Sequence, residues 1–260
     1  MPVPPTLLVP ESSVINTDVT VDAKVHDPLG SWLIASGALL PTRDSRPYRD
    51  CLEHAIETWK PWITRLSVTV ETLMKDAAAL ATDFTRHACA ENIGSTTIRH
   101  IATTCADGEL RTKMLAHADD EDRHSRMFAA LAKHVDAPVA EGLATLTSEN
   151  EVFLEEFGGD LSWFLADTHI AELRNLAILG LYVKAAVEAP QRELHVVKTL
   201  EKIFRDEWSH VSYTAPLVAA LVGAGPDEKG EFVETLDHYA EISSSEADAL
   251  ADRLSHGAHP

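Results

Sequence analysis

Two short stretches of the chain carry residue types that bind metal ions. "DDEDRHSR" contains Glu121 and His124, and "RDEWSH" contains Glu207 and His210 at the same spacing. A helix places residues three apart on one side, so each Glu and His can share a target. A single pair of this kind is also typical of a charged, solvated helix face. Its repetition, with an Asp before each Glu, favours two related metal-binding segments.

Two further acids complete a plausible ligand set. Glu91 in "HACAENIGST" and Glu172 in "ADTHIAELRNLAILGLY" stand among small and apolar residues. An isolated acid in such surroundings is costly unless it is paired, protonated or bound to a cation. Antiparallel helices joined by short loops return to the same height after the distances that separate Glu91 from Glu121 and Glu172 from Glu207. The spacing therefore predicts that six ligands converge.

The elements that must position these residues are expected to be helices throughout. The pattern predicts helices at 29–40, 48–60, 63–104 in one or two pieces, 109–135, 160–189, from after Pro190 to about 221, and 226–254. Pro61 is expected to break a helix or start a new one, and Pro216 to kink one. Gly108 is expected to end a helix and Asp160 to cap one. Ser148 and Glu151 form a candidate capping box.

These elements predict an all-α protein built on a four-helix bundle, with additional N-terminal and C-terminal helices. We expect residues 1–28, which are rich in Pro, Val, Thr and Asp, to form an extended arm. Residues 29–260 are expected to form a single helical domain, with the metal-binding four-helix core at about 76–222.

The composition of the chain indicates which kinds of partner it is expected to bind and where in the cell it is expected to lie. The formal net charge of −19 and the lack of a basic stripe disfavour binding to nucleic acid or to an anionic membrane surface. The three cysteines, Cys51, Cys89 and Cys105, are widely spaced and form no CxxC motif, so they are expected to be reduced packing residues. No secretion signal or long apolar span is evident. We therefore expect a cytoplasmic protein.

The order of the six ligands resembles that of the ferritin-like di-iron carboxylate superfamily. Its members include bacterial multicomponent monooxygenases, acyl carrier protein desaturases and the small subunits of ribonucleotide reductase. The "DEDRH" stretch is similar to the DExRH form of the monooxygenases and desaturases. The resemblance implies a four-helix bundle that holds two iron ions and uses O₂. It also implies that Asp120 and Asp206, which precede Glu121 and Glu207, contact ligand histidines and fix their orientation.

Departures from the family's patterns narrow this resemblance. Phe128 stands where reductase subunits usually carry a radical tyrosine, and Ile203 stands where arylamine N-oxygenases carry an added histidine ligand. His117 instead precedes the first ExxH pair by one turn, and it is either a seventh ligand or an outer or surface histidine. His87 and His169 lie on the faces of Glu91 and Glu172 and have the same two interpretations.

One residue is a candidate for catalysis. Asn175 lies one turn after Glu172, where desaturases often carry a Thr, so it could supply a polar group near the oxygen site. A hydrogen bond between helices is the alternative role.

The ligand set favours iron, with manganese as the alternative, over zinc or copper(I), because it is rich in carboxylates. The leading hypothesis is a dinuclear iron oxygenase or oxidase that uses O₂ to hydroxylate, N-oxygenate or desaturate a small organic substrate, in specialised metabolism. The alternatives are a ferroxidase or iron store, a manganese catalase, and a structural bundle without metal.

One basic cluster in the sequence is a candidate docking site for a partner. Arg43, Arg46 and Arg49 cluster in an otherwise acidic chain and could dock a carboxylate, a phosphate or an acyl carrier protein, although a solvated loop is the favoured explanation. An electron donor is a further possible partner. Helical bundles of this type commonly pair, so we expect a homodimer.

Overall fold

The computed structural model describes residues 45–136, 160–189 and 193–256. These residues form six helices and no strand, which confirms the expected all-α class. The helices are α2 (Arg46–Leu73), α3 (Ala77–Ala102), α4 (Gly108–Val135), α6 (Leu161–Glu188), α7 (Leu194–Val222) and α8 (Pro226–His256).

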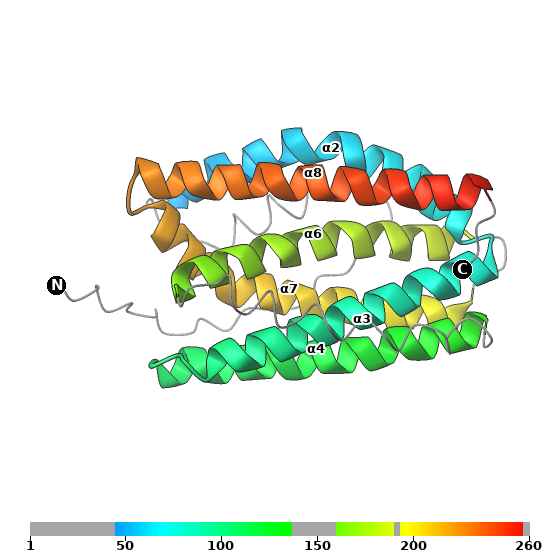
Figure 1. Cartoon of the computed structure of the whole chain (residues 1–260), viewed down its shortest axis with the longest axis horizontal. Coiled ribbons are helices and arrows are strands. Elements are labelled where there is room, and N and C mark those ends of the chain that lie inside the picture. Colours follow the sequence, from blue (N-terminus) through cyan, green and yellow to red (C-terminus); the bar gives the residue numbers. More distant parts are fainter. Residues whose placement is uncertain (1–44, 137–159, 190–192, 257–260) are drawn as a thin grey trace.

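The helices pack as three pairs. Helix α3 packs along α4, α6 along α7, and α2 along α8. Figure 1 shows α3 and α4 on one side of the molecule, α2 and α8 on the other, and α6 and α7 between them. The four central helices of the chain thus form a bundle core, and α2 and α8 are the additional helices that cover α6 and α7.

Aspartates define the starts of three core helices. The carboxylate of Asp76 accepts a hydrogen bond from the amide of Ala79, and Asp107 accepts from Glu109 and Leu110. Asp160 accepts from Ser162 and Trp163, which confirms its expected role as a cap. Each cap satisfies amide groups that have no partner within the helix. These caps fix where three of the four helices that carry ligand candidates begin, whereas α7 has no side-chain cap.

Two expected boundaries were wrong. Helix α2 continues through Pro61 instead of breaking there. Proline has no amide hydrogen, so the carbonyl of Glu57 loses its usual helical partner. Pro61 and Glu57 are both exposed, so water can hydrogen-bond to that carbonyl. The buried Trp59 and Trp62 anchor this part of the helix in the core. Gly108 begins α4 directly after the Asp107 cap instead of ending the preceding helix. The true break lies between α2 and α3.

Two apolar clusters occupy different levels of the bundle. The larger one contains Phe84 and Phe128 and extends under α2 and α8. The smaller one contains Ile98 and Met114 near the opposite ends of α3 and α4. On α3, Glu91 lies between the levels of Phe84 and Ile98. On α3 and α4 the metal-ligand candidates therefore lie between the two apolar clusters, whereas on α6 and α7 the larger cluster packs on both sides of them. This packing shields the candidates from water.

The outer helices are attached by specific contacts as well as by apolar packing. The indole N–H of Trp59 donates to the carbonyl of Leu236 over 3.2 Å, and His54 Nε2 lies 2.6 Å from Asp237. These contacts hold α8 against α2. No helix within the described ranges is both long and apolar enough to cross a lipid bilayer.

Several predictions fall outside the described residues. These are the extended arm at 1–28, the helix at 29–40, and the capping box of Ser148 and Glu151.

Candidate metal centre

Seven side chains from the four core helices converge in two groups that could each hold a metal ion. One group consists of His117, Glu121, Glu172 and His210, and the other of Glu91, Glu121, His124 and Glu207. Within each group the ligand atoms lie within 4.8 Å of one another, and every residue is buried. Glu121 belongs to both groups. The six residues expected from the sequence are all present, together with His117.

The two ExxH histidines face the carboxylates with the same ring nitrogen. His124 Nδ1 lies 3.1 Å from Glu207 Oε1, and His210 Nδ1 lies 3.0 Å from Glu207 Oε2 and 3.3 Å from Glu121 Oε1. Nδ1 is therefore the nitrogen available to a metal ion on both rings.

The opposite nitrogen of each ring faces an aspartate of the other helix. His124 Nε2 lies 3.3 Å from Asp206 Oδ2 on α7, and His210 Nε2 lies 3.5 Å from Asp120 Oδ2 on α4. A carboxylate at Nε2 favours a proton there and leaves the Nδ1 lone pair free for a metal ion. The aspartate before each glutamate thus faces the histidine of the partner helix. Asp206 does so through a hydrogen bond and Asp120 through its charge alone, because His210 Nε2 has no hydrogen-bond partner among the described residues.

Arg123 ties this outer layer together. Its guanidinium forms ion pairs with Asp120 at 2.5 Å and with Asp206 at 2.9 Å. The ion pair with Asp206 joins α4 to α7 at the level of the cluster. Because Arg123 contacts both aspartates, it fixes the two carboxylates that orient His124 and His210.

His117 lies inside the cluster. Its Nε2 lies 2.9 Å from Glu172 Oε1 and 3.2 Å from Glu121 Oε1, and its ring stacks on that of His210 with centroids 3.6 Å apart. Its Nδ1 lies 2.9 Å from the hydroxyl of Tyr213. The Tyr213 contact leaves Nε2 to face the carboxylates, so His117 is placed as a third imidazole of the centre.

The buried atoms that lack partners fit a bound cation. Glu121 Oε1, Glu172 Oε2, Glu207 Oε1 and His124 Nδ1 have no hydrogen-bond partner among the described residues. A buried polar atom without a partner is costly, and here the four are atoms that metal ions bind. Four glutamates also carry the charge that two divalent cations would neutralise. The donor set therefore fits two metal ions.

Electrostatics within the cluster support the same conclusion. Burial and the neighbouring Glu172 and Glu121 raise the pKa of Glu207 to about 7, and burial with Glu121 raises the pKa of Glu91 well above its usual value. Burial also acts to raise the pKa of Glu172, but the nearby His117 holds it well below its usual value. Without cations, the glutamates cannot all ionise readily at neutral pH.

His169 lies outside both metal groups. It is fully buried, its Nδ1 lies 2.7 Å from the hydroxyl of Thr214, and its Nε2 lies 2.6 Å from the hydroxyl of Tyr48. Thr214 donates its proton to the carbonyl of His210, so it accepts from His169 Nδ1–H. Burial lowers the pKa of His169 to about 3, and the neutral ring joins α2, α6 and α7.

His87 and Asn175 also lie outside both groups. His87 stacks on Phe128 with centroids 5.0 Å apart, and its Nε2 lies 3.6 Å from Asp83. Asn175 is half-buried on α6, and its suggested catalytic role stays a prediction.

Sequence reasoning left the place of His117 open and did not single out Tyr213 or the cross-helix role of Arg123. His117 precedes Glu121 by four residues and Tyr213 follows His210 by three, so both lie on ligand-bearing faces. That spacing was the signal that the sequence offered. Charged and aromatic residues at helical spacing are common, however, so these two could be assigned to the site only once the packing of α4 against α7 was known.

Comparison of the chain with protein-family models, curated proteins and solved structures found no match. The fold and the site define the class: an all-helical bundle with a buried carboxylate and histidine cluster that could hold metal ions.

Proposed function

We propose that this protein is a dimetal oxidoreductase of the ferritin-like kind, which uses two iron ions and O₂ to oxidise a small organic substrate. The observation that carries the proposal is the pair of buried ligand groups that share Glu121. A shared carboxylate holds two metal ions close enough to act on one bound molecule. Iron suits a set of four carboxylates and three imidazoles, and manganese is the alternative.

The chain's own residues prepare the centre for this chemistry. When bound, two iron ions would supply the electrons that reduce O₂. Asp206 and Asp120 hold the ring orientation of His124 and His210. The apolar residues packed around the two buried groups exclude water, which strengthens the electrostatic interactions inside.

The two other metal functions make different demands. An iron store must pass many ions through its site, whereas the described residues enclose two groups at a fully buried position. A manganese catalase would use the same ligands without an organic substrate. We favour an organic substrate because a cavity with polar and apolar walls lies beside the ligand helices α3 and α6.

The experiment is anaerobic loading with Fe(II), followed by mixing with air-saturated buffer while dissolved O₂ is recorded. We expect O₂ uptake that saturates at about two irons per chain and that is absent in Glu121→Ala. Iron accumulation far beyond two ions per chain would instead indicate storage. Rapid loss of hydrogen peroxide with the manganese-loaded protein, and no O₂ uptake with iron, would indicate a catalase.

A further inference from the structure

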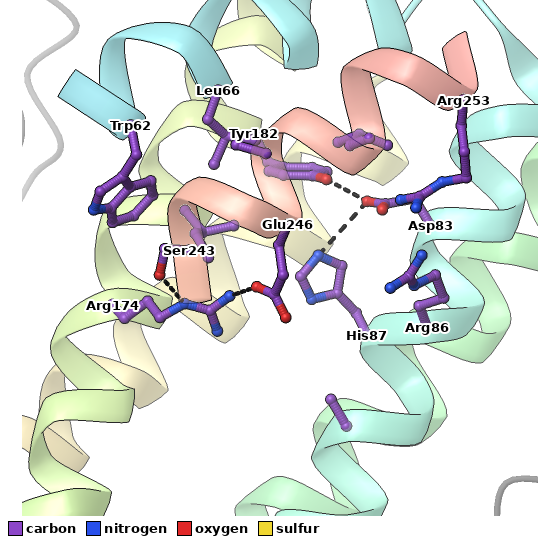
Figure 2. A pocket seen from close by; sticks show the side chains of 14 residues that line it. Trp62, Leu66, Asp83, Arg86, His87, Arg174, Tyr182, Ser243, Glu246 and Arg253 are labelled. Carbon is purple, nitrogen blue, oxygen red and sulfur yellow. Dashed lines mark hydrogen bonds and ion pairs between the residues drawn. The ribbon is translucent and has the colours of Figure 1, made fainter. Parts of the chain in front are cut away.

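A cavity of about 180 Å³ lies beside the candidate metal centre. Its walls come from α2, α3, α6 and α8, and Figure 2 shows their side chains. Two wall residues connect the cavity to the ligand-bearing segments: Ala90 directly precedes Glu91, and Arg174 follows Glu172 by two residues. With a rise of about 1.5 Å per residue, this end of the cavity lies near the level of the ligands.

The cavity lies on a particular side of the centre. Its walls include α3 and α6, which carry the lone glutamates, and exclude α4 and α7, which carry the histidines. The outer contacts of the histidines occupy the α4 and α7 side. A molecule in the cavity would therefore lie on the side of the centre that carries Glu91 and Glu172, although neither glutamate lines the cavity.

Some charged groups on the cavity walls have hydrogen-bond or ion-pair partners and others do not. Arg174 donates to the hydroxyl of Ser243 over 2.7 Å and forms an ion pair with Glu246. Tyr182 donates its hydroxyl proton to Asp83. The two acids of the cavity therefore have partners.

Arg86 and Arg253 differ from these groups, because neither forms a hydrogen bond or an ion pair with any described residue. Figure 2 shows both on the side of the cavity near Asp83, with Arg174 on the opposite side. Burial and the charge of Arg86 lower the pKa of Arg253, and the nearby Asp83 and Glu246 offset this lowering only in part. A further anion beside the two guanidinium groups would therefore be favourable.

The walls carry three arginines and two carboxylates, which leaves an excess of one positive charge. A monoanion neutralises that excess, whereas a phosphate monoester at about −1.5 to −2 would overcompensate it. Guanidinium groups also match the planar geometry of a carboxylate. The charge balance thus favours a carboxylate over a phosphate.

The rest of the lining sets the shape of the ligand. Trp62, Leu66, Ile178 and Leu250 supply apolar surface, which suits a hydrocarbon body. An apolar cavity of about 150 Å³ is large enough for benzene. The cavity is therefore the size of one ring or a short chain.

We propose that this cavity binds a small carboxylic acid with a single ring or a short hydrocarbon chain, held by Arg86 and Arg253. Its body would extend along the apolar wall toward Ala90 and the ligand helices. The assignment of this acid as the substrate rests on the proposed function, whereas binding itself does not require the metals.

Benzoate is the probe, and benzamide is the matched neutral compound. We expect calorimetry on the metal-free full chain to give a dissociation constant for benzoate of about 1 mM or lower and no saturable binding of benzamide. Absence of benzoate binding, or equal binding of the two compounds, would overturn the proposal.

Variants test the assigned contacts. The double variant Arg86→Gln with Arg253→Gln should weaken benzoate binding by more than about tenfold, because charged hydrogen bonds are lost. Arg205→Gln, an exposed arginine on α7 away from the cavity, is the control and should bind benzoate normally. Ala247→Leu should also abolish binding, because Ala247 lines the cavity and a larger side chain fills it. Circular dichroism would show that each variant folds.

A final experiment tests the cavity proposal separately from the proposed dimetal function. Benzoate proton signals should broaden with the protein loaded with Mn(II), which is paramagnetic, and remain sharp with Zn(II). Binding without broadening would contradict the approach to the centre and leave the carboxylate site intact. Normal metal loading without benzoate binding would overturn the cavity proposal and leave the dimetal function intact.

Discussion

The two halves of the core repeat one design but differ at one position. Helices α3 and α4 supply Glu91, Glu121 and His124, and α6 and α7 supply the equivalent Glu172, Glu207 and His210. The aspartates that contact the histidines are also equivalent. One turn before Glu121, however, stands His117, and one turn before Glu207 stands the buried, apolar Ile203.

The difference would make the two proposed metal positions chemically unequal. One position is offered two imidazoles, from His117 and His210, and the other only that of His124. The surroundings of His117 and Ile203 differ as well. His117 contacts the hydroxyl of Tyr213, whereas Ile203 packs in the larger apolar cluster. A repeated backbone arrangement can thus provide two sites with different donor sets.

The largest expected effect comes from removing an ExxH histidine. His124→Ala or His210→Ala should weaken one metal position by more than about 100-fold, since outer partners alone are worth about 10–100-fold. Competition titration with a chromophoric chelator would measure both affinities. His169→Ala, in the buried network outside the cluster, should lower the melting temperature and leave metal affinity within a few-fold of wild type. Equal metal losses in all three variants would remove the distinction between ligands and structural histidines.

His117→Ala addresses the difference between the halves directly. We expect it to weaken one of the two metal positions by about tenfold or more and to leave the other unchanged, measured by the same titration. The matched variant Ile203→Ala should retain both affinities but lose about 2–5 kcal/mol of stability, because it leaves a cavity in the core. Unchanged metal binding in His117→Ala would mean that this histidine has only a packing role.

The outer aspartates should show a smaller effect. Asp206→Asn should reduce the affinity of the position held by His124 by about tenfold, since it removes the charge that orients this ring. Asp120→Asn should have a weaker effect on the position held by His210. His124 Nε2 has a hydrogen bond with Asp206, whereas His210 Nε2, 3.5 Å from Asp120, has no hydrogen-bond partner among the described residues. A larger effect of Asp120→Asn would reverse this ranking.

The smallest expected effect is the dependence of metal binding on pH. The raised pKa of Glu207, about 7, means that this carboxyl is largely protonated below neutrality, and a metal ion binds the deprotonated form. Apparent affinity should therefore rise with pH through about 7. It should keep rising toward about 9, because burial acts to lower the pKa of His124 but hydrogen bonds to Asp206 and Glu207 raise it to about 9. Titrations between pH 6 and 8 would measure this slope, and a flat profile would contradict it.

Much of the fold could be predicted because helical periodicity, aspartate caps and prolines are local signals. Asp160 and Pro226 marked helix starts correctly, whereas Pro61 misled because its exposed position makes the missing hydrogen bond tolerable. Repetition and isolation in the sequence singled out six of the seven residues that the structure brings together in the two buried groups. The inclusion of His117 and the exclusion of His169 depended on how α4, α6 and α7 pack, which no local pattern reports.

The most direct test of the account is the metal content per chain after aerobic iron loading and desalting, measured by mass spectrometry for wild type and Glu121→Ala. Because Glu121 belongs to both ligand groups, the account predicts about two irons per chain in wild type and the loss of both in the variant. An absence of bound metal in wild type, or an unchanged content in Glu121→Ala, would contradict it.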